Sequence, residues 1–163
     1  GLLGPVNMGM CRGLNLLLGI AAAPPVLAEA WPLALLPLVY ITAVTAVSRG
    51  EVHGGRRGIA AFALISLSGV LVALLALALR HADGSSAGVG FTALLAWRVL
   101  PAFWGVYETP EPGPIRHATR TGVLSLVLLD AVIGATYGGA LYSLAIVATG
   151  LVAWSLARLF SLT

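Results

Sequence analysis

The chain has 163 residues, of which 59% are hydrophobic and 9% are charged, and its mean hydropathy is +0.98. Soluble domains carry about 25% charged residues, so this composition excludes an ordinary globular domain in water and indicates a protein that has lipid as its solvent. The nine basic residues are all arginines that occur singly or in pairs between apolar runs, and the net charge is +3. This arrangement excludes nucleic acid as a partner.

Six apolar segments follow one another along the chain, each long enough to approach or exceed the thickness of the hydrocarbon core. They are Val6–Ala23, Trp31–Ser48, Ile59–Leu79, Phe91–Tyr107, Thr121–Tyr137 and Leu141–Phe160. Pro24 and Pro25 are expected to stop the first. The pattern predicts an all-α, polytopic transmembrane bundle of about six helices, forming a single membrane-embedded domain over residues 1–163 in contact with the lipid bilayer. Because the chain begins with Gly1 and lacks a signal-peptide pattern, we expect it to be a fragment of a longer protein.

The loops predict the orientation of the bundle. Gly, Pro and polar residues mark the connections Arg49–Gly58, His81–Gly90 and Glu108–Arg120. With six crossings, one side holds seven arginines and the other holds Arg80 alone. By the positive-inside rule the arginine-rich side, including Arg49–Gly58, is cytoplasmic, and we expect a bacterial inner membrane. The seven are Arg12, Arg49, Arg56, Arg57, Arg116, Arg120 and Arg158.

Polar residues form a stripe within the first span. Asn7, Cys11, Arg12 and Asn15 lie within an arc of roughly 140° at 100° per residue. One interpretation is hydrogen bonding between helices, with a snorkelling arginine. The other is the wall of an anion-binding cavity in which Arg12 faces phosphate.

The second span ends in a polar face that continues into a loop. Ser48 and Arg49 close the span, and the loop that follows contains Glu51. Glu51 is a candidate ligand for Mg²⁺, an ion that prefers carboxylate oxygen together with substrate phosphate. Alternatively, Glu51 is a solvated carboxylate paired with Arg49 or Arg56.

Asp130 is the only carboxylate well inside a span, and Arg98 is its candidate partner on charge grounds. Asp130, Gly134 and Gly138 are four residues apart, so they share a helical face, and the two glycines allow close helix contact. The three histidines are scattered over different loops, which argues against a histidine metal site.

Two stretches carry a resemblance to a known family. The first is Cys11-Arg12-Gly13-Leu14-Asn15-Leu16-Leu17-Leu18-Gly19, and the second is Thr45-Ala46-Val47-Ser48-Arg49-Gly50-Glu51. They resemble the fifth helix, and the sixth helix with its second acidic motif, of the UbiA superfamily of membrane prenyltransferases. The resemblance implies the C-terminal part of a bundle of about nine helices whose active site opens to the cytoplasm.

The resemblance also implies an activity, the transfer of an isoprenyl group from a diphosphate to an aromatic or apolar acceptor, with Mg²⁺ as cofactor. Glu51 would then be the catalytic and metal-binding carboxylate. The residues implied to bind the isoprenyl diphosphate or line its pocket are Arg12, Asn15, Asn7, Tyr40, Ser48 and Arg49. Two departures are visible: Ser48 stands where the family has an aspartate, and the family's first acidic motif has no equivalent in these residues. The alternative is a non-catalytic transmembrane subunit that packs against other membrane subunits in a larger energy-transducing or pigment-binding complex.

Overall fold

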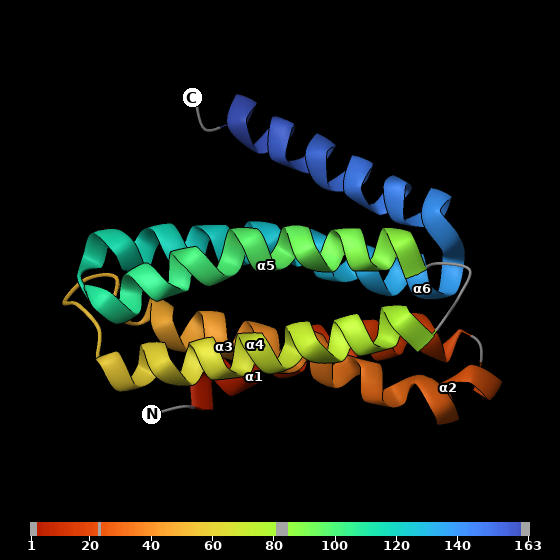
Figure 1. The fold of residues 1–163 in the computed structure, drawn as a ribbon, viewed down its shortest axis with the longest axis horizontal. Helices are drawn as coiled ribbons and strands as arrows, with labels where there is room; N and C mark the ends of the chain where they lie inside the picture. Colours follow the sequence, from red (N-terminus) through yellow and green to blue (C-terminus); the bar gives the residue numbers. More distant parts are fainter. Residues whose placement is uncertain (1–2, 23, 81–84, 161–163) are drawn as a thin grey trace. The chain divides into compact units, whose positions relative to one another are not determined.

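The structure, a computed structural model, describes residues 3–22, 24–80 and 85–160, and all regular secondary structure within these ranges is helical. The elements are α1 (Leu3–Ala21), α2 (Pro24–Ala30), the 3₁₀ helix η1 (Trp31–Ala34), α3 (Leu35–Ser48), α4 (Arg57–Arg80), α5 (Ser85–Glu108) and α6 (Pro112–Phe160), as Figure 1 shows. The all-α prediction is confirmed.

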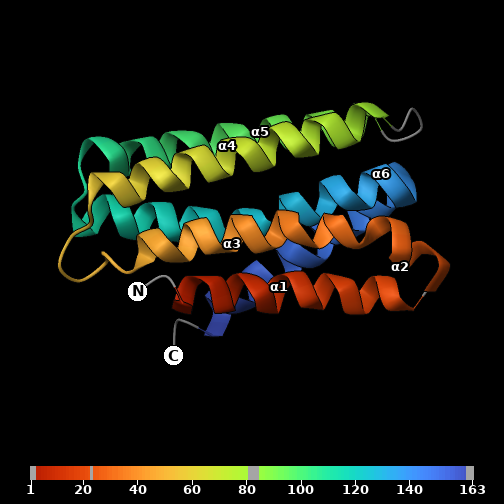
Figure 2. The ribbon, with the colours of Figure 1, turned by 90° about the horizontal axis from the view of Figure 1, so that it is seen from below.

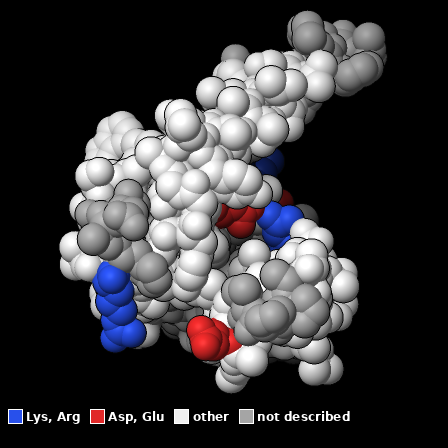
Figure 3. Space-filling view, turned by 90° about the vertical axis from the view of Figure 1, so that its right-hand side faces the viewer, with Lys and Arg blue, Asp and Glu red and all other residues white. Residues whose placement is uncertain are grey.

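Four of the helical segments are long and apolar enough to cross a membrane. They are Leu27–Ser48, Arg57–Arg80, Ser86–Glu108 and Pro112–Leu156. Large apolar side chains on them, such as Ile65 and Trp97, are exposed, as expected for surfaces in contact with lipid. The face shown in Figure 3 is largely uncharged, with few basic and acidic side chains. These features indicate an integral membrane protein.

The predicted count of about six transmembrane helices is not confirmed, because only four segments are long and apolar enough to cross a membrane. The first expected span corresponds to α1, which is helical over 19 residues but is not among the four segments. The first helix was expected to stop at Pro24 and Pro25. α1 ends at Ala21, and a new helix, α2, begins at Pro24. Proline fits the first turn of a helix, where its missing N–H has no partner to lose.

Two of the predicted loops are shorter than the sequence indicated. Glu108–Arg120 was expected to be a loop, but α5 continues to Glu108 and α6 begins at Pro112. The prolines at the start of α6 lie in its first turn, where they are compatible with a helix, so they mark its beginning rather than a longer loop. The expected loop His81–Gly90 is likewise helical from Ser85 onward, and its residues 81–84 lie outside the described residues.

The chain forms two compact units. Unit 1 consists of Gly1–Ala73 and Ala96–Leu124, and unit 2 of Leu74–Leu95 and Ser125–Thr163. The divisions fall inside α4, α5 and α6. The predicted loop Arg49–Gly58, which contains Glu51, belongs to unit 1.

Within unit 1, α1 packs along α3 in antiparallel orientation (Figure 2). The contact is made through Gly9 and Gly13, which are both buried on α1. A side-chain carbon at Gly9 would meet Thr42 Oγ1 and the Leu38 carbonyl oxygen, and one at Gly13 would lie 2.9 Å from the Ala34 carbonyl oxygen. Small residues four apart therefore let the two backbones approach, as in other membrane helix pairs.

The core of unit 1 lies around α3. Tyr40, Val44, Phe103 and Ile115 are all at most 1% exposed. Gly122 on α6 lies against Val44 and Phe103, where a side-chain carbon would come within 2.8 Å of Val44 Cγ2. The second half of α3 is thus buried on most of its circumference.

Within unit 2, the chain reverses direction at Gly139. Its backbone angles, φ 78° and ψ 177°, interrupt α6, and they lie in a region that essentially only glycine adopts. The segments before and after it pack antiparallel, since a side-chain carbon at Gly150 would meet Val127 and one at Gly134 would meet Ile146. Figure 1 shows the turn at the end of the light-blue part of α6. The close helix contact predicted at Gly134 is confirmed, whereas Gly138 is exposed and lies against Tyr142 just beyond the turn.

Candidate functional site

The candidate site is built on the loop 49–56 between α3 and α4. The end of α3 tightens through two turn hydrogen bonds, from Gly50 N to Val47 O and from Glu51 N to Ser48 O, each 3.0 Å. Gly54 N then donates to Gly50 O at 2.9 Å, and Gly54 has a φ of 84°, a left-handed value that favours glycine. The glycines therefore fold the loop back on itself within a few residues.

This loop docks onto the connection between α5 and α6. Gly55 N donates to Pro110 O at 2.8 Å, and Arg57 Nη2 donates to the Glu108 carbonyl oxygen at 3.3 Å. A side-chain carbon at Gly50 would lie 2.7 Å from Ile115 Cδ1 and 2.9 Å from Gly55 Cα. Glycine is thus required at position 50 for the loop to close over Ile115.

A cavity of about 140 Å³ lies beneath the loop. At about 30 Å³ per water molecule it has room for a group the size of a hydrated anion, and it is smaller than the 300–1,000 Å³ typical of pockets for larger ligands. The loop glycines and two arginines form its polar part, and apolar side chains form the rest. The lining residues are Ala46, Val47, Arg49, Gly50, Gly54, Gly55, Arg56, Ile59, Ala60, Val106 and Ile115.

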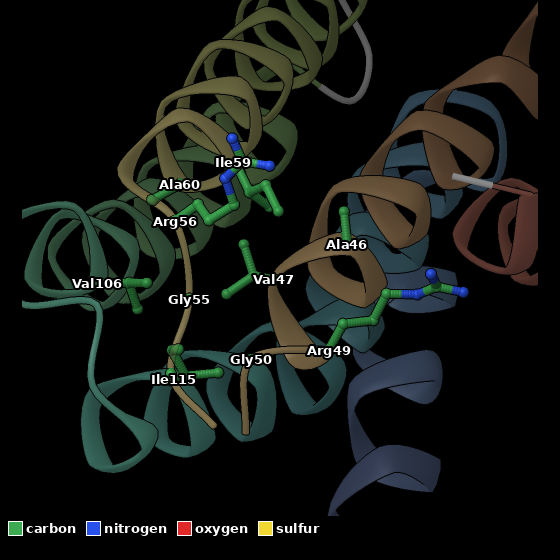
Figure 4. A pocket seen from close by; sticks show the side chains of 11 residues that line it. Ala46, Val47, Arg49, Gly50, Gly55, Arg56, Ile59, Ala60, Val106 and Ile115 are labelled. Carbon is green, nitrogen blue, oxygen red and sulfur yellow. The ribbon is translucent and has the colours of Figure 1, made fainter. Parts of the chain in front are cut away.

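The two arginines of this cavity do not converge. In Figure 4, Arg49 and Arg56 lie on opposite sides of Val47, and the Arg49 guanidinium points away from Arg56. The Arg49 guanidinium instead lies against Gly4, where a side-chain carbon would come 3.6 Å from Arg49 Cζ. Both arginines are exposed. The cavity therefore has a positive rim without a preformed two-arginine clamp.

Of the residues predicted for the site, the structure brings together Ser48, Arg49 and Glu51, which lie in one turn. The Ser48 hydroxyl donates to the Thr45 carbonyl oxygen at 3.0 Å, so it caps the end of α3. Glu51 is half-buried but does not line the cavity, whereas Arg49 does.

Tyr40 is placed elsewhere. It is 1% exposed and its hydroxyl donates to the Gly122 carbonyl oxygen at 2.9 Å, which links α3 to α6 inside the core. It is not among the residues that line the cavity. This bond joins residues 82 positions apart, and no pattern in the sequence indicates it.

The predicted residues on α1 do not join the loop either. The glycine contacts fix the register, with Gly4 opposite Arg49 and Gly13 opposite Ala34 and Leu38. Arg12 is eight residues beyond Gly4, so its backbone lies about 12 Å farther along the helix axis, away from the loop. Asn7 and Asn15 are exposed and Arg12 is half-buried.

The residues of the loop do not fit an Mg²⁺ site by themselves. Within the described ranges no group of three or more His, Cys, Asp or Glu side chains lies close enough to hold a metal ion. Glu51 is the loop's only carboxylate. In the neighbouring turn, Glu108 Oε1 already accepts a hydrogen bond from Trp104 Nε1 at 3.0 Å. Mg²⁺ at a diphosphate site is usually held by one or two carboxylates together with the phosphates of the substrate, and no carboxylate lines the cavity beneath the loop.

Sequence reasoning missed two contributors to this region. The sequence predicts Arg56 only as a cytoplasmic charge and as a possible partner of Glu51, and it predicts the turn that contains Pro110 as part of a longer loop. The available signal is the concentration of glycine and arginine between Arg49 and Gly58. Comparisons with protein-family models, with curated proteins and with solved structures found no match for this chain.

Proposed function

We propose that the chain is a UbiA-type, prenyltransferase-like integral membrane protein and that its loop 49–56 binds the diphosphate of an isoprenyl donor. The observation that carries the proposal is a glycine-rich, basic loop that closes over a cavity of about 140 Å³ at the end of two apolar helices. Three arginines and one glutamate between Ser48 and Arg57 give this segment a net charge of +2 (3 − 1). A fixed positive rim favours an anionic headgroup, and the apolar helix surfaces favour its hydrocarbon chain.

In the proposed reaction the carbon–oxygen bond of the isoprenyl diphosphate breaks and the diphosphate leaves with the electron pair. The allylic cation is captured by an aromatic or apolar acceptor, which then loses a proton. Arg49 and Arg56 would stabilise the negative charge that develops on the leaving group through their positive charge at the rim of the cavity. Because no carboxylate lines the cavity beneath the loop, we propose no step through a metal for these residues.

We further propose six membrane crossings in a bacterial inner membrane, with the loop 49–56 in the cytoplasm. Two features support six rather than four. α1 packs on α3 and on the 3₁₀ helix that precedes it, and Gly139 divides α6 into segments 112–138 and 140–160. At 1.5 Å per residue these are about 40 and 31 Å long, each sufficient for one crossing. The seven-to-one distribution of arginines supports the orientation.

The test is binding and transfer with the intact gene product in proteoliposomes, using a radiolabelled isoprenyl diphosphate. Arg49→Ala should weaken binding of the donor about tenfold, as expected for loss of one charge-assisted contact. Arg80→Ala, which changes an exposed arginine at the other end of α4, is the matched control and should bind normally. Donor binding that is equal in both variants would refute the assignment of the loop, and a protein that binds no isoprenyl diphosphate would refute the proposal.

A second candidate, a non-catalytic membrane subunit, is favoured by one observation. Asn7, Cys11 and Asn15 are spaced four apart on α1 and are all exposed. Polar side chains at membrane depth need partners, so another helix is expected to cover this face. The native Cys11 reports on it: a membrane-permeant maleimide should label Cys11 in the purified protein but not in native membranes. Equal labelling in both would show that nothing covers the face.

A further inference from the structure

Arg98 is a charged residue within an apolar helix. It lies in the candidate span Ser86–Glu108 of α5, ten residues before the helix ends, which is about 15 Å along its axis. Its side chain is exposed. A charge at this depth is expensive in hydrocarbon and normally has a partner or a water-filled cavity.

The charge of Arg98 acts on the hydroxyl of Tyr40, which already donates its proton to the Gly122 carbonyl oxygen. A hydroxyl offers a dipole and not an opposite charge, so Tyr40 does not neutralise the charge of Arg98.

A groove of about 440 Å³ opens beside Arg98 between α5 and the start of α6. Glycine and proline form most of its walls, and no atoms lie within 4 Å of the position that a side-chain carbon at Gly105 or Gly113 would occupy. The volume falls in the range typical of small-molecule sites. The lining residues are Arg98, Pro101, Ala102 and Gly105 from α5, and Gly113, Pro114 and His117 from α6.

The polar side chains of the groove are basic or neutral. Arg98 contributes the charge from α5, and His117, also exposed, contributes a ring N–H donor from α6. No carboxylate lines the groove. Exposed Trp104 lies on the adjoining face of α5, four residues before the helix ends, and tryptophan near a helix end is typical of the membrane interface.

This groove is separate from the cavity beneath the loop. Ile115 lines the loop cavity, whereas Gly113, Pro114 and His117 line the groove, so the first turns of α6 present different faces to the two sites. The groove has about three times the volume of the loop cavity (440 against 140 Å³).

We propose that the groove between α5 and α6 binds a phosphate-bearing anionic headgroup, with Arg98 as the charged contact and His117 as a second donor. Arginine is suited to phosphate because its planar fork can form two parallel hydrogen bonds. Basic pockets between membrane helices bind anionic headgroups in this way. The phosphate could come from an anionic phospholipid that enters sideways or from soluble phosphate that enters from the aqueous end. The inference is independent of prenyl transfer.

The experiment is native mass spectrometry of the full chain, titrated separately with phosphatidylglycerol and phosphatidylcholine. The wild-type protein should retain phosphatidylglycerol preferentially. Arg98→Gln should weaken this binding at least about tenfold and His117→Gln by a smaller factor, whereas Arg98→Lys should retain part of it. Arg80→Gln removes an exposed arginine outside the groove and should bind as the wild type does.

Inorganic phosphate distinguishes the two sources. Displacement of phosphatidylglycerol by inorganic phosphate, dependent on Arg98, would show that the groove accepts free phosphate. Retention of the lipid in excess phosphate would identify the phospholipid as the ligand. Equal binding of the two lipids by the wild type, or undiminished phosphatidylglycerol binding by both Arg98→Gln and His117→Gln, would overturn the proposal. Circular dichroism of each variant confirms that the helices are retained.

Discussion

Replacing Gly9 by leucine should separate α1 from α3. A side-chain carbon at Gly9 would meet Thr42 Oγ1 and the Leu38 carbonyl oxygen, and the carbonyl belongs to the backbone, so it cannot rotate away. The helices must then move apart, and a gap of only 0.5–1 Å removes about a quarter to a half of the dispersion energy of the contacts it opens. Overpacking of this kind costs about 1–3 kcal/mol. Because a leucine must be accommodated against a fixed carbonyl, we expect about 2–3 kcal/mol.

The assay is equilibrium unfolding in mixed micelles with an increasing fraction of sodium dodecyl sulfate, followed by circular dichroism. Gly19→Leu is the matched control on the same helix, because Gly19 is exposed and a side-chain carbon there would have no neighbours within 4 Å. The control should change the free energy of unfolding by less than about 0.5 kcal/mol, or raise it slightly through helix propensity. Equal free energies of unfolding for Gly9→Leu and Gly19→Leu would refute the packing of α1 on α3 through its glycine face.

Three further predictions concern the core, the reversal and the orientation. Tyr40→Phe removes the hydrogen bond to Gly122 O and should lower the free energy of unfolding by about 1 kcal/mol in the same micelle assay; no change would contradict a structural role. Gly139→Ala forces a side chain into the φ 78°, ψ 177° conformation and should cost about 1–3 kcal/mol, whereas an unaffected midpoint would show that the chain does not reverse there. Cysteines placed at Gly54 and Gly113, in a chain lacking its native cysteine, should react with an impermeant maleimide from the cytoplasmic face; labelling only from the periplasmic face would refute the orientation.

The fold class followed from composition and from apolar run length, because a membrane helix must satisfy its backbone internally and exclude charge. The run Ile59–Leu79 lies wholly inside α4. Helix ends were less predictable, since proline and glycine serve both as breakers and as first-turn or capping residues. Pro112 begins α6 instead of extending a loop, and the distinction depends on which backbone N–H groups need a partner.

The candidate site was predictable where its residues are close together in the sequence. Ser48, Arg49 and Glu51 are neighbours in sequence, so a single turn holds them together. Their relation to Arg12 and Asn15 depends on the register between α1 and α3, which Gly9 and Gly13 set through contacts with Leu38 and Ala34. No periodicity within α1 reveals that register, because the same glycines could pack at any turn of a neighbouring helix.

Topology explains several of the arginines but does not explain Arg98. Arg49 and Arg56 belong to the loop 49–56, and Arg57 follows it. The positive-inside rule assigns this loop to the cytoplasm, so its positive charge is expected whether or not the loop binds a ligand. Orientation gives no reason for Arg98, which lies about 15 Å from the end of α5. A residue kept at that depth against its solvation cost needs a compensating partner. For the loop, measurements of activity are needed to distinguish a ligand site from a topological signal. For the groove, a measurement of binding is sufficient. The Arg98 variants therefore test a specific function more directly than any variant of the loop arginines.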